Sequence, residues 1–187
     1  KNMANVDQAF GLRAIGKVGQ NRDNQGLSEY QIAANSTAIY QGDPVILDDT
    51  GFIEVAAATN ANLIGVLNGI FYTDAATNKP TWANHLAASN TATDIQGFVA
   101  DDPYERFEVQ SAGTVARTNI GNCADIVYAA GSTPNYVSGV EASGTMAAGT
   151  AQLKIIGLAK TQDNAFGANA VVVVTINEHI LKQTAGI

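Results

Sequence analysis

The sequence predicts an all-β protein, either a compact antiparallel β-barrel or a β-sandwich, with an extended N-terminal arm. Along its 187 residues, many short runs of β-branched and aromatic residues are separated by Gly, Pro, Asn and Asp turn signals. Almost no stretch repeats its apolar residues with the period of a helix. We therefore expect residues 1–26 to form the arm. Residues 27–187 are expected to form a single β domain with a long loop at about 73–94.

The predicted arm is polar and punctuated by glycines, and its few apolar residues are isolated. Their spacing matches neither a helix face nor strict β alternation, so the segment is expected to be extended. Phe10, Leu12 and Ile15 are its predicted anchors, because apolar side chains left in water cost free energy. These anchors would dock either on the same subunit or on a neighbouring one.

The stretch Gly42–Tyr72 is predicted to organise the domain. Val45–Leu47 and Phe52–Val55 should pair as a hairpin around the turn Asp48–Gly51, in which the glycine can adopt a positive φ. Leu63–Tyr72 should follow as a longer strand. It contains two glycines, which inside a strand mark bulges, bends or close backbone approach.

Further strands are predicted on both sides of this hairpin. They are Leu27–Ala33, Ile95–Ala100, Tyr104–Gln110, Thr114–Ala116, Tyr136–Val137 and Gln152–Lys160. Ile120–Gly131 is expected to be either a short helix or irregular. Ala170–Glu178 is the most apolar run, and its continuity predicts a strand buried on both faces.

Charged residues make up only 14% of the chain, and the formal net charge is −7. Nucleic-acid-binding domains concentrate Lys and Arg, so we expect no nucleic-acid partner. No apolar run approaches the roughly 20 residues of a membrane span, and no signal-peptide pattern opens the chain, so we expect no membrane partner. A polar but weakly charged surface suits a protein that lies against other protein.

The sequence contains no motif that predicts catalysis or cofactor binding. A phosphate-binding loop, a dinucleotide fingerprint, a zinc-protease helix and a serine-hydrolase elbow are all missing. His85 and His179 are the two histidines, and the single Cys123 leaves no intrachain disulfide or cysteine-based metal cluster. The acidic pairs at 48–49 and 101–102 lie in predicted turns without the spacing of a calcium loop. We expect no catalytic residue, no cofactor and no metal, and hence no enzyme.

The predicted long loop holds the only tryptophan, Trp82. Tryptophan is enriched in the energetic centres of protein interfaces, so Trp82 is a candidate interface residue. Packing of its ring on the domain itself, which would pin the loop, explains the residue equally well.

Six segments, taken in order, carry a resemblance to a known family. They are ANVDQAFGLRAIG (4–16), YQGDPV (40–45), IGV (64–66), DDPYERFEVQ (101–110), IGNCADIVYAAG (120–131) and NAFGANAVVVVTINEH (164–179). Together they span nearly the whole chain, and FEVQ with the closing segment is the most distinctive part. They resemble the virion proteins of tailed bacteriophages that decorate or cement the capsid.

This resemblance implies a β-barrel or β-sandwich that binds the outer surface of the major capsid protein shell and stabilises it by bridging capsomers. The protein would be made in the host cytoplasm and reside on the capsid exterior as a homo-oligomer, with a trimer favoured and a dimer next. The family has no catalytic residues to transfer.

Two other functional classes remain open. A receptor- or glycan-binding virion module, such as a fibre or tail domain, would need several exposed aromatic residues in one cluster. An enzyme would need a pocket that gathers His85 or His179 with carboxylates.

Overall fold

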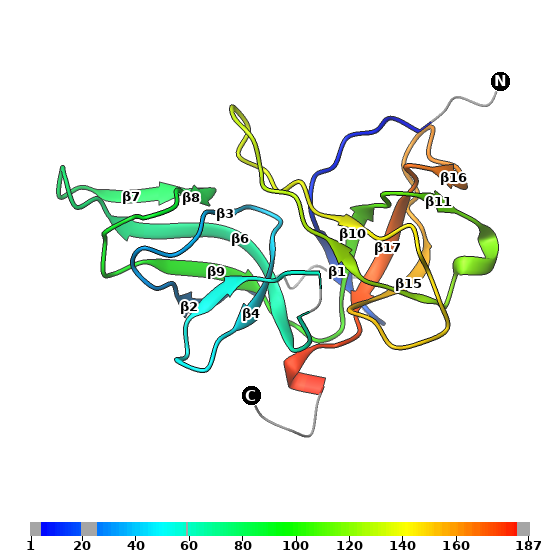
Figure 1. The fold of residues 1–187 in the computed structure, drawn as a ribbon, viewed down its shortest axis with the longest axis horizontal. Coiled ribbons are helices and arrows are strands. Elements are labelled where there is room, and N and C mark those ends of the chain that lie inside the picture. The colour runs from blue at the N-terminus through cyan, green and yellow to red at the C-terminus, as the bar shows by residue number, and fades with distance from the viewer. Residues whose placement is uncertain (1–4, 20–25, 59, 183–187) are drawn as a thin grey trace.

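The computed structural model describes residues 5–19, 26–58 and 60–182, and within them the protein is all-β (Figure 1). This part of the chain contains seventeen strands and no α-helix. It also contains two short 3₁₀ helices, Arg117–Asn119 and Ile180–Lys182. Several antiparallel sheets pack together as in a sandwich, and none closes into a barrel. The predicted fold class is confirmed, with the sandwich as the alternative that the structure adopts.

One half of the molecule is built on a five-stranded sheet, on the right in Figure 1. Its strands, in spatial order, are β1 (Arg13–Lys17), β10 (Glu105–Gln110), β17 (Val171–Ile176), β15 (Leu153–Leu158) and β12 (Cys123–Ala124). Two strand pairs accompany it: β11 (Thr114–Val115) with β16 (Gly167–Ala168), and β13 (Ile126–Val127) with β14 (Glu141–Ala142). The segment 120–131, predicted as a helix or irregular, thus contains two short strands.

The other half is built on a six-stranded sheet. Its spatial order is β2 (Ser28–Gln31), β9 (Gln96–Ala100), β6 (Leu63–Thr73), β4 (Pro44–Leu47) and β5 (Ile53–Val55), and β7 (Pro80–Ala83) also pairs with β6. A separate pair joins β3 (Ile39–Tyr40) to β8 (His85–Leu86). The predicted central hairpin is confirmed, because Val45 pairs with Val55 and Leu47 with Ile53. The stretch 73–94, predicted as a long loop, contains β7 and β8.

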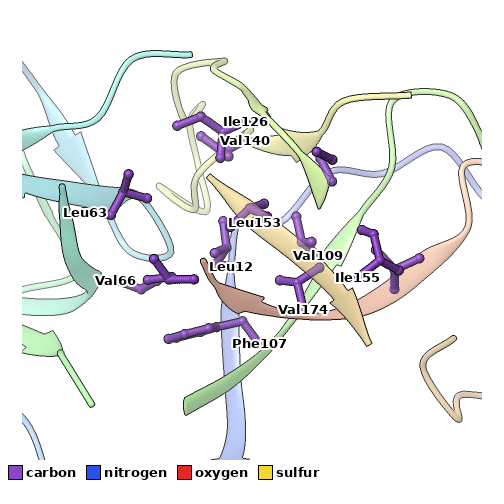
Figure 2. Close-up of a cluster of buried hydrophobic side chains, with 14 of the residues drawn as sticks. Leu12, Leu63, Val66, Phe107, Val109, Ile126, Val140, Leu153, Ile155 and Val174 are labelled. Carbon is purple, nitrogen blue, oxygen red and sulfur yellow. The ribbon is translucent and has the colours of Figure 1, made fainter. Parts of the chain in front are cut away.

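Two hydrophobic cores share a common wall formed by β4 and β6. Successive side chains of a strand point to opposite faces, so Val45 lies in one core and Ile46 in the other. β6 also contributes to both cores, with Leu63 and Val66 in one and Ile64 and Leu67 in the other, because a bulge in its pairing with β4 shifts the alternation by one residue. Figure 2 shows Leu63 and Val66 approaching the core of the five-stranded half. The stretch expected to organise the domain therefore separates its two cores.

β17 is the central strand of the five-stranded sheet, but only one of its faces is fully buried. Val172, Val174 and Ile176 are almost completely inaccessible, whereas Val171 and Val173 are half-buried. The prediction that this run is buried on both faces is wrong for one face. Valine favours β-strands whether or not it is buried. The half-buried valines on the outer face are therefore explained by strand propensity alone. The strand buried on both sides is instead the first half of β6, Leu63–Leu67.

The described part of the arm, residues 5–19, lies extended along the five-stranded half. Its β1 pairs with β10 and thereby becomes an edge strand of that sheet. Leu12 is buried in the core beside Leu153 and Phe107 (Figure 2). Gly11 passes so close to its neighbours that a Cβ atom there would lie 2.5 Å from the Cβ of Ser138. The arm is thus built into the sheet rather than merely resting on it.

Side-chain amides fix the first arm residues, where no strand ladder exists. The Asn5 Nδ2 donates to the carbonyl oxygens of Ala165 and Ala168, at 3.0 and 2.7 Å. The buried Gln110 accepts a hydrogen bond from the Gln8 amide at 2.8 Å and donates to the Val6 carbonyl at 2.6 Å. These bonds satisfy backbone groups that an extended segment leaves open.

Candidate interaction surfaces

The structure places the four predicted interface residues in different environments. Leu12 is buried in the protein's own core, and Phe10 is half-buried, with the guanidinium of Arg13 5.0 Å from its ring centroid. Ile15 is 43% exposed and Trp82 is 70% exposed. Ile15 lies on β1 and Trp82 on β7, in the two different sheets. Two of the four side chains are thus available for a partner, at separate places.

The arm and the neighbouring residue Tyr104 carry four exposed apolar side chains, distributed along the length of the arm. We define the arm surface as Val6, Ile15, Val18 and the adjacent Tyr104, all of which are exposed. Val18 and Tyr104 are held together, because the Val18 amide donates to the Tyr104 carbonyl at 2.9 Å. Ion pairs from Arg13 to Glu108 and from Lys17 to Asp102 fix the strand beneath. The exposed apolar side chains of the arm surface are thus carried by a segment that is hydrogen-bonded and ion-paired to the domain.

A second exposed apolar surface lies on the six-stranded sheet. We define the aromatic platform as Phe71 on β6, Trp82 on β7 and Phe98 on β9. The Trp82 ring lies 4.8 Å from that of Phe71 and 5.2 Å from that of Phe98, measured between centroids. Sequence reasoning found Trp82 but missed the two phenylalanines. Each lies in a predicted strand, but nothing local shows that their strands flank one another.

A cleft of about 380 Å³ opens between the arm and β6. Its walls are mainly apolar and include Leu12, Ala14, Leu27, Val66 and Val137. The polar side chains at its edge include Arg13 and Asp102, which are already engaged in the ion pairs described above. The cleft is therefore a hydrophobic depression beside the arm surface.

The two histidines lie in different halves of the molecule. His85 stacks on Tyr136 at 3.8 Å and faces Tyr40 at 6.1 Å, and partial burial lowers its pKa. His179 is fully buried, and its Nδ1 accepts a hydrogen bond from the Leu181 amide at 3.2 Å. Burial, aided by the positive charge of Lys182, lowers the pKa of His179 to about 4. His179 is therefore neutral at pH 7, and its side chain caps the 3₁₀ turn Ile180–Lys182 that follows β17.

Asp43 is a buried carboxylate in the turn before β4. Its Oδ2 accepts a hydrogen bond from the Tyr40 amide at 2.8 Å. Burial raises the pKa of Asp43 from 3.8 to about 6, against the opposing effects of the Ser138 hydroxyl and the Tyr40 amide. The folded protein therefore binds a proton between about pH 6 and 3.8 that the unfolded chain does not bind. Stability contributed by this group rises as the pH falls through that window.

We predict that Asp43→Asn stabilises the protein at pH 7.5, because asparagine keeps an acceptor for the Tyr40 amide and removes the buried charge. The gain should not exceed roughly 3 kcal/mol, the free energy that corresponds to the shift of the Asp43 pKa. It should disappear below about pH 4, where the parent carboxyl is protonated in both states. Urea denaturation of the parent and variant at pH 7.5, 6 and 4 measures this difference. A variant less stable than the parent at pH 7.5 would contradict the prediction.

Within residues 5–19, 26–58 and 60–182, no group of three or more His, Cys, Asp or Glu side chains is placed to hold a metal ion. The same part of the chain has no helix that is long and apolar enough to cross a membrane. Comparison of the chain with models of protein families, with curated proteins and with solved structures returns no match.

Proposed function

We propose that the protein is a capsid decoration or cement protein of a tailed bacteriophage, with a structural rather than a catalytic role. The proposal rests on the resemblance of six ordered segments to that family and is supported by an all-β fold with an extended arm. The observation that carries it is the arm surface. Apolar side chains in solvent are costly, yet here they are held in place by a hydrogen-bonded and ion-paired strand.

In this proposal, the arm surface contacts the major capsid protein on the outside of the shell. Each copy contributes a modest contact, and the many copies on one shell, together with oligomerisation, multiply the avidity. Closed rotational symmetry is the usual arrangement of identical subunits, and threefold positions are abundant on an icosahedral shell, so we favour a trimer, with a dimer next.

The test is co-sedimentation of the purified protein with shells assembled from the major capsid protein of the same phage. We predict that Ile15→Asp weakens shell binding by about ten-fold or more, because it places a charge in an apolar contact. Val127→Asp is the matched control: Val127 is 40% exposed but lies on β13 and is not part of the arm surface. It should bind like the parent protein.

Two outcomes would count against this proposal. Failure of the parent protein to bind any shell would refute the decoration function. Equal binding by Ile15→Asp and the parent would remove the arm surface as the contact. Electron microscopy of decorated shells would then show the copy number and whether the bound protein is a trimer.

A further inference from the structure

The aromatic platform is held rigidly by three neighbouring strands. Phe71 is the cross-strand partner of Trp82, and β6 is flanked on its other side by β9, which carries Phe98. The rings of Trp82 and Phe98 are nearly parallel, 23° apart, whereas Phe71 is inclined at 49° to Trp82. Trp82 is nevertheless 70% exposed. A flat ring that is fixed before a ligand arrives loses little entropy on binding.

Polar side chains extend the platform across the same face of the sheet. Gln96 on β9 pairs with Phe71 on β6. On β2, Glu29 pairs with Phe98 and Gln31 pairs with Gln96. Directly opposed residues in antiparallel strands share one face, so these three side chains form a polar strip beside the rings. Within the described part of the chain, none of the three side chains makes a hydrogen bond. The strip therefore offers two amides and one carboxylate to a ligand.

The charge of this face selects among ligand classes. None of the strands β2, β6, β7 and β9 contains a lysine or an arginine. On these strands a phosphorylated or sulfated ligand would meet the Glu29 carboxylate and no cationic side chain, and the overall net charge of −7 also disfavours it. An apolar protein surface would bury the amides of the polar strip without partners, which is costly. A neutral ligand that is rich in hydroxyl groups meets neither obstacle.

We propose that the aromatic platform and the polar strip bind a neutral oligosaccharide. The apolar C–H face of a pyranose ring packs on the open face of Trp82, because the negative π face attracts its partly positive hydrogens. Sugar hydroxyls both donate and accept, so they match the amides of Gln96 and Gln31 and the carboxylate of Glu29. From Trp82 to Gln31 the site crosses three strand spacings, roughly 14 Å, which suits several sugar units. This inference does not depend on capsid binding.

The test is electrophoresis of the native protein through gels that contain hydroxyethyl cellulose, laminarin, dextran or galactomannan, with heparin as an anionic comparison. We expect at least one neutral polysaccharide to retard the protein and heparin to have no effect. Trp82→Ala should weaken the retardation by about ten-fold, and Gln96→Ala should weaken it less. Because Trp82 is the only tryptophan, the same polysaccharide should also change the intrinsic fluorescence of the parent protein.

Tyr104→Ala is the matched control, since Tyr104 is an equally prominent exposed aromatic residue but belongs to the arm surface. It should be retarded like the parent. The exposed position of Trp82 makes loss of folding by Trp82→Ala unexpected, and circular dichroism checks this. The proposal is overturned if no neutral polysaccharide retards the parent, if Trp82→Ala is retarded equally, or if only heparin acts. It is also overturned if capsid shells, but no polysaccharide, alter Trp82 fluorescence, because the platform would then be a protein contact.

Discussion

Val172→Asp is expected to prevent folding, whereas Val173→Asp, one position along the same strand, should leave the protein folded. Val172 is completely inaccessible to solvent and pairs with Val109 on β10 and Leu158 on β15. A carboxyl group at such a site must remain protonated or carry a buried charge. Full burial raises a carboxyl pKa by roughly 3–5 units, which costs about 4 kcal/mol at pH 7, where the buried group becomes protonated, in addition to the lost valine packing. That loss approaches the whole stability of a typical domain.

Val173→Asp is the control, because it places the same charge on the same strand but on the opposite face of the sheet. Val173 is half-buried on the outer face, opposite Glu108. A new aspartate there keeps contact with water, and its repulsion from Glu108 is screened at high salt, so we expect a loss of about 1 kcal/mol. Circular dichroism and urea denaturation in high salt compare the two variants with the parent. Equal unfolding of both variants would show that both faces of β17 are buried, in conflict with the structure.

Local chemistry made some elements predictable from the sequence. The hairpin of β4 and β5 follows from its turn, in which Asp48 Oδ1 accepts hydrogen bonds from the Thr50 and Phe52 amides at 2.9 Å. These contacts span only four residues, so the sequence pattern contains them. The long strand β6 could also be predicted from the sequence, because its apolar run is bounded by turn residues.

The assignment of buried faces was not predictable in the same way. The sequences of β6 and β17 both predict strands, and β17 has the more continuous apolar run, but only β6 lies between two cores. Which strand becomes the shared wall depends on how the sheets assemble, and strand periodicity does not contain that information. The candidate surfaces show the same limit. Phe98 meets Trp82 only because β6 pairs with both β7 and β9. Gln110 holds the arm from a position about a hundred residues away.

Gly65→Ala should produce the second large effect, because it adds one methyl group inside the shared wall. Gly65 pairs with Val45 on β4 and lies against β9. A Cβ atom there would lie 2.3 Å from the Ala100 carbonyl oxygen and 2.7 Å from the Val99 Cγ1. The carbonyl belongs to the backbone, so relief requires β6 and β9 to separate and both cores to open. We expect a loss of roughly 3 kcal/mol or more, at the upper end of overpacking effects.

Gly69 on the same strand provides a matched control for this substitution. A Cβ atom at Gly69 would have one neighbour within 4 Å, the Ala83 carbonyl oxygen at 3.8 Å, which is an ordinary contact. Alanine also restricts the unfolded chain, so Gly69→Ala should be neutral or more stable by about 0.5 kcal/mol. Urea denaturation followed by circular dichroism measures both variants. A Gly65→Ala protein as stable as Gly69→Ala would mean that β6 and β9 do not approach as closely as the structure shows. The two cores would then not share a tightly packed wall.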